Sequence, residues 1–108
     1  MATSEATLVR ILEKIQGDNI RAAKMFGEYT IYCDEKVVAL IADDQMFLKI
    51  TAASRAELDP SHEAPPYPGA KPFLKVPDER IQDSAWITSL VNAIAADLPQ
   101  PKPKRRKS

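Results

Sequence analysis

Apolar residues recur every three or four positions near the amino end of the chain. This first set lies within residues 4–16 and consists of Leu8, Ile11, Leu12 and Ile15. The spacing predicts an amphipathic helix that Thr3 or Ser4 caps and that Gly17 ends. Burying each large side chain of such a stripe contributes about 1.5–3 kcal/mol, so we expect this helix to dock on another element.

The same periodicity returns near the carboxyl end and predicts a helix over residues 84–98, capped by Asp83 and ended by Pro99. Its apolar stripe comprises Ile87, Leu90, Val91, Ile94 and Leu98. A shorter helix is predicted for residues 51–58, with Thr51 as its cap. Residues 59–72 contain five prolines and one glycine and predict a loop.

The middle of the chain alternates in a different way, with apolar runs at residues 29–33, 37–42 and 46–50. Short acidic turns separate the runs, which is typical of an antiparallel three-stranded meander. Neither turn contains glycine, so we expect type I turns or longer loops rather than primed two-residue turns. A further strand is predicted at residues 73–76, at an edge because prolines flank it. The resulting class is α+β, an antiparallel sheet of the meander plus one or two further strands, in the order α-β-β-β-α-β(β)-α.

Both faces of the predicted sheet carry apolar side chains. If helices cover one face, the second keeps four large residues, namely Tyr32, Val38, Leu40 and Phe47. A sheet with one solvated face would alternate apolar and polar residues instead. Because three predicted helices are few for two faces, we predict that these four residues form an interface with a second copy or another protein, with Tyr67 or Phe73 nearby. The alternative is that a helix or the proline-rich loop covers them.

The 108 residues suit one domain, which we expect over residues 1–98, followed by a disordered tail at 99–108. Residues 1–101 carry ten basic and fifteen acidic residues and hence a net charge of −5. The basic residues of the tail are Lys102, Lys104, Arg105, Arg106 and Lys107. They allow weak nucleic-acid binding as an alternative function, or they are simply a solubilising terminus.

Residues with catalytic or metal-binding potential are few. Cys33 is the single cysteine, so no internal disulfide forms, and the acidic neighbours Asp34 and Glu35 would raise its pKa. His62 is the single histidine, whereas a zinc site needs three or four ligands. No apolar run approaches the length that spans a bilayer. We therefore expect a cytoplasmic protein with no enzymatic activity, cofactor, metal or membrane contact. A small-ligand pocket between the proline-rich loop and the sheet is a further alternative.

Residues 25–50, "MFGEYTIYCDEKVVALIADDQMFLKI", resemble the signature of the TfoX/Sxy N-terminal domain family. That signature combines "MFGG-x-G-[LI]-Y", "AL[IV]ADG" and "LYLK", and a weaker likeness continues through residues 66–96. Glu28 and Thr30 replace small residues of the family pattern, and Asp44 replaces its glycine. The resemblance implies a secretion-chaperone-like α/β sandwich with helices mainly on one face of the sheet. It also implies a role in competence or transcription regulation. Since no second family domain follows in this sequence, we expect a stand-alone N-terminal-type domain that acts by protein association.

Overall fold

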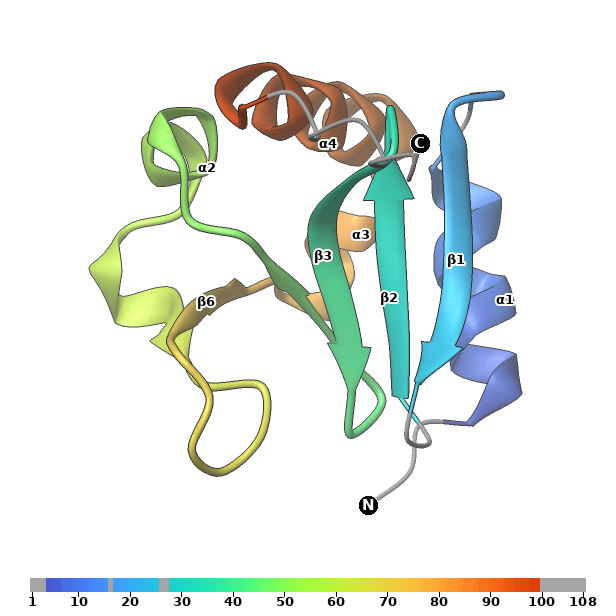
Figure 1. Cartoon of the computed structure of the whole chain (residues 1–108), viewed down its shortest axis with the longest axis horizontal. Coiled ribbons are helices and arrows are strands. Elements are labelled where there is room, and N and C mark those ends of the chain that lie inside the picture. The colour runs from blue at the N-terminus through green and yellow to red at the C-terminus, as the bar shows by residue number, and fades with distance from the viewer. Residues whose placement is uncertain (1–3, 16, 26–27, 100–108) are drawn as a thin grey trace, which may run out of the picture.

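The computed structural model describes residues 4–15, 17–25 and 28–99. It is an α+β fold, as predicted, with the chain coloured from end to end in Figure 1. In chain order the elements are α1 (Glu5–Lys14), β1 (Ile20–Met25), β2 (Glu28–Cys33), β3 (Lys36–Ala42), β4 (Gln45–Leu48), α2 (Ala52–Glu57), the 3₁₀ turn η1 (Pro60–His62), β5 (Glu63–Ala64), β6 (Phe73–Lys75), α3 (Asp78–Ile81) and α4 (Ser84–Asp97).

The strands form a single six-stranded sheet in the order β1-β2-β3-β4-β6-β5, with antiparallel pairing throughout. The meander therefore begins one strand earlier than predicted, at β1. The edge position predicted for residues 73–76 is wrong, because β5 pairs outside β6. This pairing is possible inside the proline-rich segment because Glu63 and Ala64 keep the backbone N–H groups that proline lacks.

The two acidic turns of the meander are two-residue turns in the left-handed region, so the expected type I geometry is wrong. Asp34 and Glu35 have φ of 54° and 65°, and Asp43 and Asp44 have φ of 52° and 60°. Positive φ at both central residues is what a type I′ turn requires, and that turn matches the right-handed twist of the flanking strands. Strand pairing thus overrides the cost of the left-handed region for non-glycine residues.

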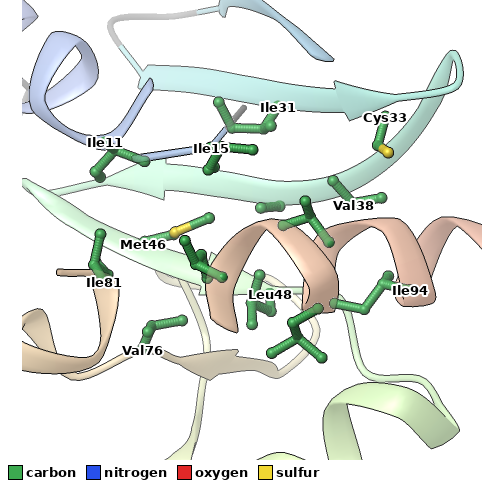
Figure 2. Packing of buried hydrophobic residues seen from close by; sticks show 14 of the residues in the cluster. Ile11, Ile15, Ile31, Cys33, Val38, Met46, Leu48, Val76, Ile81 and Ile94 are labelled. Carbon is green, nitrogen blue, oxygen red and sulfur yellow. The ribbon is translucent and has the colours of Figure 1, made fainter. Parts of the chain in front are cut away.

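The hydrophobic core lies between one face of the sheet and helices α1, α3 and α4. Figure 1 shows α1 and α3 behind β1–β3, while no helix crosses the front of these strands. The helices contribute the stripe predicted for α4 together with Ile11, Ile15 and Ile81, and the strands contribute Ile31, Cys33, Ala39, Ile41, Met46, Leu48 and Leu74. These side chains interdigitate in one layer (Figure 2). The prediction that helices pack mainly on one face is confirmed.

Side chains also fix the ends of the helices. The Nζ of Lys36 in β3 donates to the carbonyl oxygens of Ala95 (2.8 Å) and Leu98 (3.2 Å) at the carboxyl end of α4, where a positive charge is favourable. The carboxylate of Asp97 accepts from the N–H of Ala53 (2.8 Å) at the start of α2. The end of α4 is thereby tied to the sheet on one side and to α2 on the other.

Asp44 joins the β3–β4 turn to the start of α1. Its Oδ1 accepts hydrogen bonds from the backbone N–H of Ser4 (2.9 Å) and the hydroxyl of Thr7 (2.8 Å). These two bonds, the Ser4 one first, hold the pKa of the Asp44 carboxyl below its ordinary value. This contact gives a physical reason for aspartate where the family pattern has glycine.

We expect Asp44→Asn to lower the melting temperature at neutral pH and to weaken the acid sensitivity of folding. The folded-state pKa of Asp44 is lowered, so its contribution is present above the unfolded pKa of about 3.9 and is lost as the pH falls through the folded pKa. Thermal unfolding of wild type and variant between pH 7 and pH 2.5 measures this. Asp43→Asn makes the same change one residue earlier in the turn. An equal effect of both substitutions on the pH profile would show that the acid sensitivity does not come from the hydrogen bonds of Asp44.

Candidate functional site

The sheet face opposite the core carries a row of side chains that spans the central strands. Thr30 of β2 lies opposite Leu40 of β3, and Leu40 lies opposite Phe47 of β4. Directly paired residues of antiparallel strands project to the same side. The core cluster takes its strand residues from the other side, where Ile31 is opposite Ala39. We call the helix-free side the open face.

Exposure along the open face varies from one residue to the next. Leu40 is partly exposed, whereas Phe47 and Thr30 are only 5% and 4% exposed. Ala23 extends the row into β1 and Lys75 extends it into β6. The row is therefore an apolar strip in which Leu40 is the most accessible large apolar side chain.

Tyr32 marks the polar border of the strip. It pairs with Arg21 of β1 and with Val37 of β3, so these three residues share the open face. The Arg21 guanidinium carbon lies 4.0 Å from the centre of the Tyr32 ring, and its Nη2 lies 2.9 Å from Glu35 Oε1. The hydrogen bonds from Arg21 lower the pKa of the Glu35 carboxyl. One side of the Tyr32 ring is thus already covered by the Arg21 guanidinium.

Val38 was predicted on this face, but it is fully buried in the core (Figure 2). The reason is a β-bulge. Ile31 pairs with Ala39, but Tyr32 pairs with Val37, so Val38 is the extra residue of β3 and turns toward α4. Val37, which is partly exposed, takes its place beside Tyr32. The sequence holds two adjacent valines and offers no signal for which one turns inward.

The other residues of the predicted surface lie further out. Tyr67, in the loop before β6, is 54% exposed, and Phe73 is partly exposed on β6. The five basic residues of the tail lie outside the residues that the structure describes. The division into residues 1–98 and a tail at 99–108 stays a prediction.

Within the residues that the structure describes, neither Cys33 nor His62 lies in a reactive arrangement. Cys33 is buried, accepts a weak hydrogen bond from Asn19 Nδ2 (3.4 Å) and donates one to Asn92 Oδ1 (3.5 Å). Burial raises the pKa of its thiol, which disfavours the nucleophilic thiolate. His62 Nδ1 lies 3.3 Å from Asp59, the cap of η1. In the described part of the chain, no three His, Cys, Asp or Glu residues are grouped to hold a metal ion.

The longest helix within residues 4–15, 17–25 and 28–99 is α4, with 14 residues. None of the helices there has both the length and the apolar character needed to cross a bilayer.

The fold and its open face define a small one-sided α+β domain. Its sequence matches the model of the TfoX N-terminal domain over residues 11–97, and the chain belongs to this family. A relative from Spirochaeta aurantia, named "Uncharacterized 12.7 kDa protein in trpE 5′region", is 39% identical over 89 residues. That match covers 82% of this chain and 76% of the relative. The resemblance found in the sequence is thereby confirmed.

Proposed function

We propose that this chain is a non-enzymatic protein-interaction domain that pairs with a second copy through the open face. The observation that carries the proposal is the group of partly exposed side chains Leu40, Tyr32 and Val37, which lies on the side of the sheet opposite the core and its helices. Pairing would remove the exposed part of Leu40 and the border residues Tyr32 and Val37 from water.

The charges around the row favour a second copy over a strongly charged partner. The cations Arg21 and Lys75 are matched in number by the carboxylates of Glu28 and Glu35. Two such faces can meet without net repulsion, although residues 1–101 as a whole carry a net charge of −5. Four strands at ~4.8 Å spacing and ~20 Å length give a face of roughly 400 Å². This is half the usual area per partner, so we expect a weak, transient pair.

We extend the proposal to the regulation of transcription, because the chain belongs to the TfoX N-terminal domain family and resembles its competence regulators. In this proposal association supplies the regulatory step, and no bond of a substrate is made or broken.

We expect Leu40→Asp to weaken dimerisation at least about tenfold, because each pair would bury two carboxylates without partners. Analytical ultracentrifugation over a concentration series measures the dissociation constant. Val9→Asp is the control, since Val9 is 49% exposed on α1, away from the open face, and should leave association unchanged. Circular dichroism checks that both variants fold. A wild-type chain that stays monomeric at about 1 mM, where even weak specific pairs assemble, would overturn the proposal.

A further inference from the structure

A groove of about 550 Å³ runs between α2 and α4, on the helical side of the molecule. Ala53, Ala56 and Ala93 form its apolar lining, and Trp86 stands at the end near the start of α4. The alternative predicted from the sequence placed a pocket between the proline-rich loop and the sheet, whereas this groove lies elsewhere. Its lining is shaped for an extended chain because small side chains leave a channel along α4.

The far end of the groove is acidic. Glu57 and Asp83 line it beside Trp86. Glu57 Oε1 accepts from the indole Nε1–H (2.9 Å), and Asp83 Oδ1 accepts from the Trp86 backbone N–H (3.1 Å). The Arg80 guanidinium carbon lies 3.9 Å from the centre of the indole ring, and its Nη2 lies 3.8 Å from Glu57 Oε1, so one cation stands beside the two carboxylates. An ionised carboxylate has about four acceptor positions, so each retains capacity for a further donor.

The chain's own carboxyl-terminal segment fits this groove in length. The segment starts where α4 ends, beside Asp97, at the opposite end of the groove from Trp86. The 14 residues of α4 extend over about 21 Å. Alternating prolines favour polyproline II, which advances about 3.1 Å per residue, so a segment that folds back from Leu98 brings Arg105 about 22 Å along, level with Asp83.

The same segment fits the groove in chemistry. Pro99, Pro101 and Pro103 would lie against the alanines and the indole, as polyproline segments lie in aromatic-lined grooves elsewhere. Four basic residues, Lys104, Arg105, Arg106 and Lys107, follow Pro103 and would lie opposite Glu57 and Asp83. All but one of the positive charges of the segment therefore come after its last proline, and the acidic end of the groove lies beyond its alanines in the same direction.

We propose that the groove between α2 and α4 is the docking site of residues 99–108 of the same chain. The basic tail is then held against the body instead of being free for nucleic acid, and a competing anionic or proline-rich partner would release it. The groove lies on the other side of the sheet from the open face, so this proposal stands apart from dimerisation.

Paramagnetic broadening in the full-length chain tests the proposal. A nitroxide is attached to Ser108→Cys, while the buried Cys33 stays unlabelled. Because Trp86 is the single tryptophan, its indole N–H gives one resolved signal. We expect this signal to lose about half its intensity at 0.05 M salt and to recover at ~1 M salt, where the Debye length is about 3 Å.

Matched variants and isotopic mixing define the outcomes. Full-length Arg105→Gln/Arg106→Gln should restore the indole intensity at low salt, as should Glu57→Gln/Asp83→Asn, which keeps the side-chain acceptor oxygens. Glu5→Gln/Asp18→Asn removes two carboxylates elsewhere and should leave the broadening intact. In a second sample, isotope-labelled chains without nitroxide are mixed with nitroxide-tagged chains that carry no isotope label. Broadening of the indole signal in this mixture would show docking between copies and overturn the intramolecular assignment. An indole signal unaffected by the nitroxide at low salt would overturn the docking site altogether.

Discussion

Truncating Leu48 to alanine should lower the free energy of unfolding by about 3 kcal/mol, whereas the same truncation at Leu40 should cost about 1 kcal/mol. The two leucines sit on neighbouring strands, but Leu48 lies opposite Ala39 on the core side and Leu40 lies opposite Phe47 on the open face. Leu48 is fully buried, and its removal leaves a cavity between the sheet and α4. At Leu40 the lost surface is already partly in contact with water.

Urea denaturation followed by circular dichroism, at concentrations below dimer formation, measures both costs. Comparable values for the two variants would contradict the one-sided core, because Leu40 would then have to be covered within the chain. At concentrations where the wild type dimerises, the cost at Leu40 should rise while that at Leu48 stays constant. This concentration dependence of the cost at Leu40 would link the stability measurement to the proposed association, since binding of a second copy stabilises only the folded state.

The helices could be predicted closely from the sequence because their signals are local. The caps Ser4, Thr51 and Asp83 each accept a hydrogen bond from the first turn of α1, α2 and α4. The three strands of the predicted meander also appear, because their β-branched and aromatic residues are bounded by acidic turns. These features depend on residues that are only a few positions apart in the chain.

The features that the sequence missed depend on pairing between distant residues. Strand β1 has two alanines and two basic residues among its six, a weak strand signal, and forms because β2 supplies its partner. The bulge that buries Val38 arises from the register between β2 and β3. The positive φ of the turns follows from the twist of the paired strands. None of these is fixed by composition or local propensity.

The candidate surface could be predicted in part. Tyr32 and Leu40 lie on the open face as the alternation indicated, and Phe47 lies there too but is nearly covered. The prediction of Val38 on this face was wrong, because Val37 lies there beside Tyr32 instead. Whether this surface binds a second copy stays a prediction, as does nucleic-acid binding by the tail. Sequence patterns identify which residues are apolar, but exposure depends on which elements come to lie over them.

The second large effect is expected at Ser54, which is fully buried in the first turn of α2. Its hydroxyl accepts from the Thr51 N–H (2.8 Å) and donates to the Lys49 carbonyl (2.8 Å). Ser54→Ala removes the partner of a backbone donor and of a backbone acceptor where water has no access. We expect a loss of about 2 kcal/mol in the free energy of unfolding.

Ser61→Ala is the matched control, because Ser61 is exposed in η1 and the Asp59 cap still accepts from the Ser61 N–H after the hydroxyl is removed. Its cost should stay within about 0.5 kcal/mol. Hydrogen exchange at the Leu58 amide, which donates to the Ser54 carbonyl (2.9 Å), separates local loosening of α2 from global unfolding. Since α2 forms one wall of the groove, local loosening should also weaken docking of the tail while leaving dimerisation intact. Equal costs at Ser54 and Ser61 would show that α2 is held by its contacts with α4 rather than by this capping network.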